Sequence, residues 1–354
     1  MHERSFSLVF AAVLLTSLNA QVTVDWIQDG GLSLALDEQN NVYTVSYDAN
    51  LGGDITLTKR NALGELLWNA NYDQTSTTRF DRATWVSTDP QGNALVSGTV
   101  MSGFSNPVNA NSLLMKFAAD GTLLWRQEYA TDFDGSYTRK CLVDQAGATY
   151  VLGLGSGPNG LVTTVRKFAP DGTALWSWFD VGIGGPVNMK FTPDSALVIA
   201  HRGQVGNANG YTKLDRDGAT VWSIGNVTSF TVGDLAGDAS GNTYLVSTGA
   251  QSGSNAVVRK VSPTGAEIWQ ETYPITAFRV EVGTDQAPVL SGFPLNGSGG
   301  AAFLKADADG TQLWVNNDAD GVNNFLLHAQ LMLDANNNAY LCAGVLFNMG
   351  ICKV

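Results

Sequence analysis

Residues 113–125 read LLMKFAADGTLLW, a stretch in which Lys116 is followed five residues later by Gly121 and four residues after that by Trp125. The same spacing recurs without variation along the chain. The six triplets are Lys59/Gly64/Trp68, Lys116/Gly121/Trp125, Lys167/Gly172/Trp176, Lys213/Gly218/Trp222, Lys260/Gly265/Trp269 and Lys305/Gly310/Trp314. A repeat of about fifty residues is typical of solenoids and propellers, so it decides the architecture before any other argument.

Each repeat contains two hairpin patterns. In residues 113–125 two apolar runs flank an Asp-Gly turn, and residues 86–98, VSTDPQGNALVSG, have the same form around an Asp/Asn/Gly turn. Residues 190–200 and 282–292 are degenerate in this second pattern, and we expect shortened turns there. Alternating apolar residues around such turns predict β-hairpins. Four short strands per repeat predict the four-stranded blades of a β-propeller.

The two chain ends supply complementary halves of a seventh repeat. Trp26 has no Lys or Gly ahead of it, and Lys353 has no Trp after it. Successive Trp residues of the repeat lie 42 to 57 residues apart, and a Trp nine residues past Lys353 would lie 48 residues after Trp314. We therefore predict an all-β fold, a single seven-bladed β-propeller over residues 21–354, closed by pairing of the N- and C-terminal strands. The strand before each Asp turn should be innermost, and the Trp strand outermost.

The first twenty residues have the pattern of a signal peptide. Arg4 precedes an apolar run over residues 6–15, and the small residue Ala20 follows. The run is too short for a bilayer span, which needs about 20 apolar residues. We expect a secreted or cell-surface protein without membrane insertion. A net charge of −12 disfavours nucleic acid as a partner.

The three cysteines do not form a disulfide framework. Cys141 is expected as a small core residue. Cys342 and Cys352 fall on neighbouring strands of the last blade, where a disulfide stays open as an alternative to two unpaired, buried thiols.

These repeats resemble those of secreted bacterial β-propeller proteins, known as SBBP repeats. The Lys/Asp-Gly/Trp half is also similar to the tryptophan-docking repeat of pyrroloquinoline-quinone-type propellers. The resemblance covers residues 21–354 and implies the propeller fold. It implies surface, adhesive or scaffolding roles, usually without assigned chemistry. The quinone-type resemblance raises a dehydrogenase function, which we disfavour because no long insertions are present to build a cofactor pocket.

The repeated Trp and Lys side chains have two interpretations. The Trp residues could form a ring of carbohydrate-stacking platforms, or they could pack between adjacent blades. The constant spacing to a turn Gly favours packing. The Asp turns offer oxygen ligands for calcium, as at Asp307 and Asp309, but none has the terminal Glu of a calcium loop. We therefore expect no cofactor, with calcium as the open alternative.

All long, variable connections are expected on one face of the propeller, opposite the short repeated turns. Variable loops on a rigid scaffold are where binding usually occurs. The candidate ligand-binding residues on or near this face are Arg79, Phe80, Asp81, Arg82, Phe104, Asp132, Phe133, Asp134, Tyr137, His201, Arg202 and His328.

The leading functional hypothesis is a non-catalytic propeller that binds a protein or glycan through this long-loop face. The alternative is an extracellular polysaccharide hydrolase or lyase with its site at the mouth of the central channel. A cluster of carboxylates with His201 or His328 would favour the enzyme. The sequence leaves the identity of the partner and the oligomeric state open.

Overall fold

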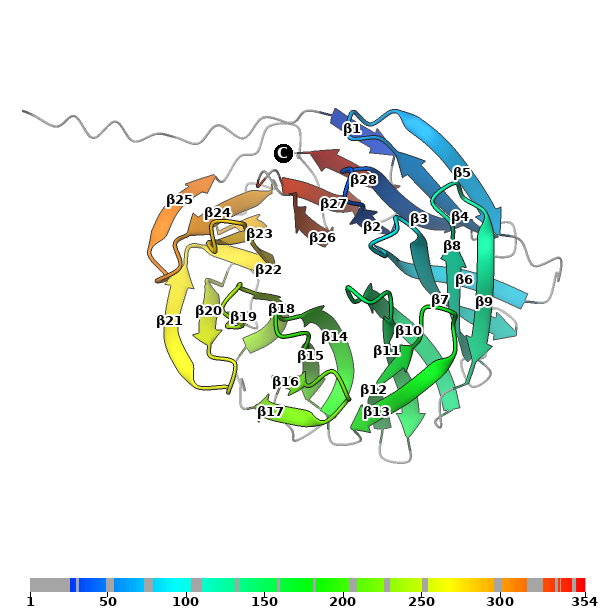
Figure 1. The fold of residues 1–354 in the computed structure, drawn as a ribbon. Coiled ribbons are helices and arrows are strands. Elements are labelled where there is room, and N and C mark those ends of the chain that lie inside the picture. Colours follow the sequence, from blue (N-terminus) through cyan, green and yellow to red (C-terminus); the bar gives the residue numbers. More distant parts are fainter. Residues whose placement is uncertain are drawn as a thin grey trace, which may run out of the picture.

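The computed structural model describes residues 26–29, 32–48, 54–72, 79–102, 110–130, 134–157, 160–180, 183–203, 209–225, 230–249, 254–295, 301–316, 327–334, 337, 339–345 and 348–353. These residues form seven four-stranded antiparallel sheets, arranged as blades around a central axis (Figure 1). The predicted seven-bladed propeller is thus confirmed. The expected signal peptide, residues 1–20, lies outside the described part. No helix in the described part is long and apolar enough to cross a membrane.

Six blades are each formed by four consecutive strands. Blade 1 contains β2 (Ser33–Leu36), β3 (Val42–Asp48), β4 (Asp54–Arg60) and β5 (Leu66–Tyr72). Blade 2 contains β6 (Arg79–Thr88), β7 (Ala94–Ser102), β8 (Ala110–Phe117) and β9 (Leu123–Tyr129). Blade 3 contains β10 (Asp134–Val143), β11 (Thr149–Gly157), β12 (Gly160–Phe168) and β13 (Ala174–Asp180).

The later blades follow the same order. Blade 4 contains β14 (Ile183–Phe191), β15 (Leu197–Gly203), β16 (Gly210–Leu214) and β17 (Thr220–Ile224). Blade 5 contains β18 (Phe230–Gly237), β19 (Thr243–Gly249), β20 (Ala256–Val261) and β21 (Glu267–Tyr273). Blade 6 contains β22 (Ile275–Val282), β23 (Pro288–Pro294), β24 (Ala302–Ala306) and β25 (Gln312–Asn316). The strand before the Asp turn is innermost and the Trp strand outermost, as predicted (Figure 1).

Blade 7 joins the two ends of the chain. It contains β26 (Leu327–Leu333), β27 (Ala339–Val345), β28 (Asn348–Lys353) and, as its outer strand, β1 (Trp26–Asp29). Trp26 stands opposite Lys353 in the antiparallel register, just as Trp125 stands opposite Lys116 in blade 2. The closure predicted from the two half-repeats is therefore confirmed.

The Lys/Gly/Trp spacing has its cause at the junction between blades. Trp125 Nε1 donates a hydrogen bond to the carbonyl oxygen of Pro170 in the next blade at 3.1 Å, and Lys116 Nζ donates to the same oxygen at 3.4 Å. The same pair of bonds forms from Lys59/Trp68, Lys167/Trp176, Lys213/Trp222 and Lys260/Trp269. These five Trp side chains therefore pack between blades, the interpretation that the spacing favours.

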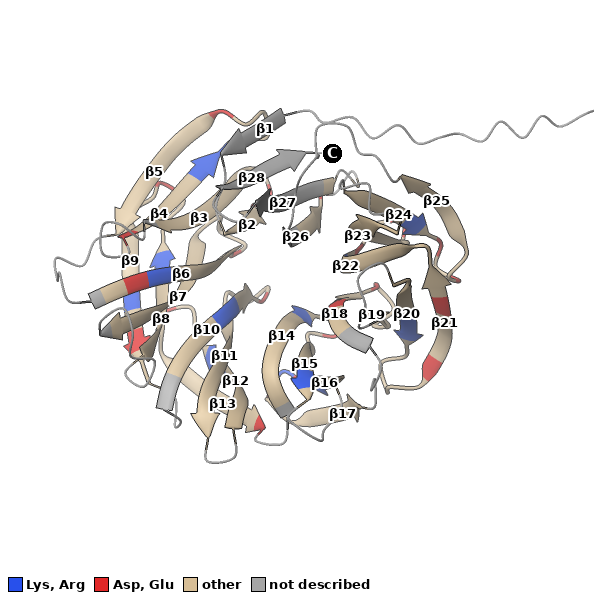
Figure 2. Ribbon diagram, turned by 180° about the vertical axis from the view of Figure 1, so that it is seen from behind, with Lys and Arg blue, Asp and Glu red and all other residues tan. Residues whose placement is uncertain are grey.

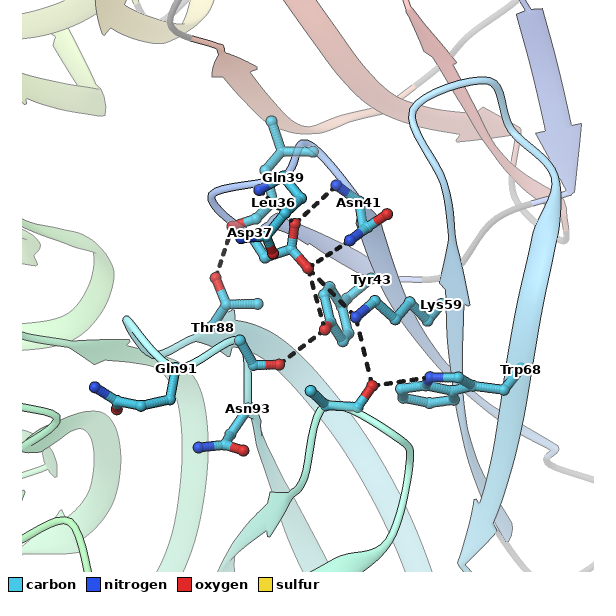
Figure 3. A network of polar contacts seen from close by, with 12 residues as sticks. Leu36, Asp37, Gln39, Asn41, Tyr43, Lys59, Trp68, Thr88, Gln91 and Asn93 are labelled. Carbon is cyan, nitrogen blue, oxygen red and sulfur yellow. Dashed lines mark hydrogen bonds and ion pairs between the residues drawn. The ribbon is translucent and has the colours of Figure 1, made fainter.

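The inner hairpin turn joins this junction through a buried carboxylate. In blade 1, Lys59 Nζ lies 3.4 Å from Asp37 Oδ2, and the Tyr43 hydroxyl donates to Asp37 at 3.3 Å and to the carbonyl of Gly92 in blade 2 at 2.8 Å (Figure 3). Asp37 also accepts the backbone N–H groups of Gln39 and Asn41. Blade 1 thereby fixes its own turn and the turn of blade 2 with the same side chains.

The two degenerate turns are not shortened, which corrects the expectation from the sequence. Residues 192–196 and 283–287 close with the same backbone hydrogen bonds as residues 89–93. Ser195 and Gln286 occupy the turn position that Gly92 has in blade 2. Both adopt a positive φ of 61°, as that position requires. In these two turns the carboxylate that pairs with the repeat Lys lies two positions later in the sequence. Asp194 pairs with Lys213, and Asp285 pairs with Lys305. The turn geometry persists without its usual residues.

The three cysteines lie on three different strands. Cys141 is fully buried in the core, as expected, and burial raises the pKa of its thiol to about 11. In the backbone register Cys342 stands opposite Ile351, and Cys352 opposite Leu341. The two residues are thus on paired strands but are not cross-strand partners.

Removal of residues 21–29 should expose the edge of β28 and open the ring, because β1 is the outer strand of blade 7. We expect the melting temperature to fall by more than about 5 °C relative to the chain that begins at residue 21. Differential scanning calorimetry measures the change. Equal melting temperatures would show that closure contributes little.

Gly172→Ala should be destabilising for a local reason. Gly172 has φ of 87°, and a Cβ there would lie 3.2 Å from the Trp125 ring. We expect a loss of about 1–3 kcal/mol in the free energy of unfolding, measured by urea titration. Gly225→Ala is the matched control, since a Cβ at that position meets no atom within 4 Å. Equal losses in both variants would contradict the packing account.

Candidate functional site

The inner strands carry β-bulges at equivalent positions. Register shifts interrupt the pairing of β6, β10, β14, β18, β22 and β26 with their neighbours, each about four residues before the turn. A bulge bends a strand and re-aims its side chains. The residues four positions before the turn include Trp85, Lys140, Asn188, Asp234 and Arg279, and all five line a cavity near the axis.

A polar network connects these residues across the blades. Lys140 Nζ donates to Asn188 Oδ1 at 2.7 Å, and the Asn188 amide donates to Asp234. Asp234 also accepts the backbone N–H of Val280 at 3.1 Å. On its other side Lys140 Nζ lies 4.4 Å from the centre of the Trp85 ring, a cation–π contact. The network runs from blade 2 to blade 6. We call the five side chains four positions before the turns, Trp85, Lys140, Asn188, Asp234 and Arg279, the constriction of the channel.

A second lysine balances the buried carboxylates of the constriction. Lys190 Nζ lies 3.3 Å from Asp234 Oδ2 and 2.6 Å from Glu281 Oε1, and it donates to the carbonyl of Val280 at 2.7 Å. Burial opposes ionisation of Asp234, but the charges of Lys190, Arg279 and Lys140 outweigh it and hold the pKa of Asp234 below its usual range. Burial raises the pKa of Glu281. The Lys190–Asp234 pair is therefore charged at neutral pH.

Lys140 has the opposite electrostatic environment. Burial is the main cause that lowers its pKa to about 7, and the nearby charge of Lys190 adds to the effect. An amine that loses its proton near neutral pH can act as a base or nucleophile. Lys140 is thus the most chemically distinctive side chain of the constriction.

Cavities lie on both sides of the constriction. On the side of the short turns, a cavity of about 300 Å³ reaches Ser87, Val143 and Glu281. On the side of the long loops, a cavity of about 560 Å³ is lined by Arg82, Tyr137, Arg139 and Leu154. Both contain Trp85, Lys140, Asn188 and Arg279, so these four residues separate them.

A third cavity adjoins the second on the long-loop side. Its volume is about 500 Å³, and its lining includes Leu161, Gly184, Gly185 and Arg202. It shares Arg139, Leu154 and Val187 with the 560 Å³ cavity. We call these two adjoining cavities the channel mouth. Figure 2 shows basic residues on the inner strands β6 and β10, and Arg82, Arg139 and Lys140 of these strands line the 560 Å³ cavity.

The structure places the predicted site residues in three groups. Arg82, Tyr137 and Arg202 line the channel mouth. Phe80, Asp81 and His201 are buried. For the others the structure gives no side-chain surroundings: Arg79, Asp134 and His328 are described only as strand residues, and Phe104, Asp132 and Phe133 lie outside the described residues.

The buried candidates have contacts in the core. The Phe80 ring meets the Tyr47 ring edge-on at 6.0 Å. His201 Nε2 lies 3.3 Å from the Thr212 hydroxyl. Burial lowers the pKa of His201, so its imidazole is neutral at pH 7. Direct contact of Phe80 or His201 with a ligand would require movement of the surrounding strands.

Sequence reasoning missed most of the constriction and part of the mouth. The missed residues are Trp85, Arg139, Lys140, Leu154, Asn188, Asp234 and Arg279. The sequence does contain a signal for these residues. The residue four positions before the turn differs in each of these blades, whereas the turn itself is repeated.

The Asp turns are occupied by hydrogen bonds of their own. Asp307 Oδ1 accepts the backbone N–H groups of Asp309 at 3.0 Å and Thr311 at 2.8 Å, the ordinary capping of such turns. Across the described residues, no three His, Cys, Asp or Glu side chains gather closely enough to hold a metal ion. Calcium binding at these turns stays a prediction.

Comparisons with known proteins show the fold. No protein-family model matches the chain, and no curated protein matches it by sequence. Among solved structures, a streptogramin B lyase is similar with a TM-score of 0.60 and 12% identity over 92% of this chain and 97% of its own. The polysaccharide lyase Uly1 has a TM-score of 0.60 and 11% identity, with coverages of 92% and 90%. YCF48 bound to a D1 peptide has a TM-score of 0.59 and 11% identity, with 94% of both chains covered.

The lowered pKa of Lys140 predicts a pH dependence of stability. The folded-state value of about 7 lies below the ordinary 10.5, so between these values the unfolded chain binds more protons and this group makes folding more favourable as pH rises. Lys140→Met should remove that slope. We expect the stability of the wild type relative to the variant to increase by about 3 kcal/mol from pH 7 to pH 9.5. Urea titrations at both pH values measure it, and parallel changes would contradict the assignment.

Proposed function

We propose that this protein is a secreted or cell-surface propeller that binds its ligand, a protein or glycan, in the channel mouth on the long-loop face, without catalysis. The observation that carries this proposal is the channel mouth itself. Two adjoining cavities of about 500 and 560 Å³ open where inner strands of several blades meet. Cavities of this size accommodate small ligands or the end of a chain.

The rigid ring supports a binding role. The side chains of the mouth project from strands whose blades are locked together by the Trp and Lys bonds, so the site is preformed. Propellers of this shape include a peptide-bound protein and a polysaccharide lyase. The fold alone therefore does not choose between binding and catalysis, and the choice rests on the site.

The composition of the mouth favours binding over hydrolysis. No Asp or Glu is among the described residues that line its two cavities. Hydrolysis of a glycosidic bond usually requires a pair of carboxylates. His201 is buried against Thr212, apart from any such pair in the described part. One observation favours the second candidate, a polysaccharide lyase, because Lys140 is a potential base at the floor of the mouth, near Tyr137.

Filling the mouth tests the proposal. Leu154 lines both cavities, so Leu154→Trp should occupy them. We expect extracellular glycans or peptides to raise the melting temperature of the wild type and to lose this effect in the variant. Leu175→Trp, at an exposed position of the outer strand β13, is the control and should respond like the wild type.

The possible results separate the candidates. A shift that survives Leu154→Trp would place binding elsewhere and overturn the proposal. A ligand that is bound and converted, with conversion lost in Lys140→Met, would replace the binding role with the enzyme.

A further inference from the structure

The charges of the channel mouth are opposite to those of the whole chain. The sequence has 32 acidic and 20 basic residues. The residues that line the two cavities nevertheless include no acidic residue among those described, and they include five basic ones: Arg82, Arg139, Lys140, Arg202 and Arg279. A chance selection of charged residues from this chain would contain more acids than bases. Lys140 loses its proton near neutral pH, so the four Arg side chains carry the charge. The mouth is thus a local cationic site in an anionic protein, an arrangement that attracts anions.

Three of the guanidinium groups form an arc over successive blades. Arg82 lies on β6 of blade 2, Arg139 on β10 of blade 3 and Arg202 on β15 of blade 4, and all three side chains are exposed. Partial burial is the main cause that lowers the pKa of Arg139 from its very high ordinary value, and the charges of Arg202 and Arg82 add to the effect. The three groups therefore repel one another, and a bound anion would relieve that repulsion.

The described carboxylates nearest to the mouth are not among the residues that line its two cavities. Asp81 is next to Arg82 in sequence, but it is buried, and successive residues of a strand point to opposite sides. Asp234 belongs to the cavity on the side of the short turns, where Lys190 pairs with it. Asp180 acts on His201 through its charge. The arc has no carboxylate of its own among the described lining residues of the mouth.

The remaining lining indicates the shape of the ligand. The half-buried rings of Trp85 and Tyr137 contribute aromatic surface to the 560 Å³ cavity. Gly160, Gly185 and Gly203 leave backbone accessible in the other. Aromatic faces pack against the C–H faces of sugar rings, while guanidinium forks bind carboxylates with two parallel hydrogen bonds. An acidic peptide would use the guanidinium groups but not these flat apolar surfaces.

We propose that the channel mouth binds an acidic polysaccharide, a linear glycan whose sugar rings carry carboxylates, with Arg82, Arg139 and Arg202 holding successive carboxylates. The proposal rests on the proposed function and names the ligand class of the same site. The carboxylates lie along the arc from blade 2 to blade 4, and a sugar ring lies over Trp85 and Tyr137.

Calorimetric titration of the full protein tests this assignment. The probes are three acidic tetrasaccharides, namely tetragalacturonate, tetramannuronate and a hyaluronan fragment, together with the methyl ester of tetragalacturonate and a tetraglutamate peptide. We expect at least one acidic tetrasaccharide to bind with a Kd below 1 mM, and the affinity to fall several-fold between low and high salt. The tetraglutamate peptide should bind at least tenfold more weakly than that tetrasaccharide. If tetragalacturonate binds, its methyl ester, which keeps the sugar rings and removes the charge, should also bind at least tenfold more weakly.

Single substitutions locate the binding. Arg139→Gln should weaken the affinity by about tenfold or more, as expected for loss of a hydrogen bond between charged groups. Arg216→Gln is the matched control and should change it less than twofold. Arg216 is an exposed residue of a short turn, on the opposite face from the mouth, and its partner Asp217 is equally exposed.

Each result has a definite meaning. Equal affinity of the methyl ester or of tetraglutamate, or equal effects of Arg139→Gln and Arg216→Gln, would overturn the acidic-glycan assignment. So would failure of all three acidic tetrasaccharides to bind. If a neutral ligand instead binds and is blocked by Leu154→Trp, the proposed function stands while the ligand class is wrong. If nothing binds in the mouth in either experiment, both proposals fail.

Discussion

Two donors from one blade share a single carbonyl oxygen of the next, and the architecture depends on this contact. Trp Nε1 and Lys Nζ come from neighbouring strands that place them side by side, as in the Lys116–Trp125 register pair. The accepting carbonyl lies two residues before a Gly, and that Gly leaves room for the indole ring. Neither a different spacing nor a Cβ at the Gly would preserve both bonds and the ring contact. The constancy of the spacing is therefore a packing requirement.

This junction also explains why the inner strands can differ between blades. The blades are held together at the outer and middle strands and at the turns, so the residue four positions before each turn is released from a common structural role. In five blades it is Trp, Lys, Asn, Asp or Arg, and these side chains form a network that no single repeat could contain. A repeated scaffold with a non-repeated centre is what a ligand site in a symmetric fold requires.

The repeat predicted the fold because packing between blades acts at every junction. The blade number, strand order and closure could all be read from the positions of Lys, Gly and Trp. The site was harder to predict, because it depends on β-bulges that no local residue pattern marks. Arg82, Tyr137 and Arg202 were found from loop position, yet Arg139 and Lys140 were missed because they look like ordinary alternating strand residues. The bulge between Thr138 and Lys140 decides that Lys140, and not Arg139, enters the network.

The turns show a second limit of residue patterns. Residues 192–196 keep the turn geometry although Thr, Ser and Ala replace the usual Asp, Gly and Asn, since Asp194 reaches Lys213 from a different position. The ion pair between a turn carboxylate and the repeat Lys is kept, although the carboxylate comes from a different position of the turn. Loss of a motif therefore did not mean loss of the structure.

Ligand binding at the channel mouth on the long-loop face is the proposal on which the function rests. Hydrogen exchange, measured with and without a saturating acidic tetrasaccharide, tests it most directly. The account predicts slower exchange in the strand segments that border the mouth, around residues 82–85, 137–140, 184–187 and 201–203, and no change in the short turns on the opposite face. Protection confined to the short turns or to the outer Trp strands would contradict it.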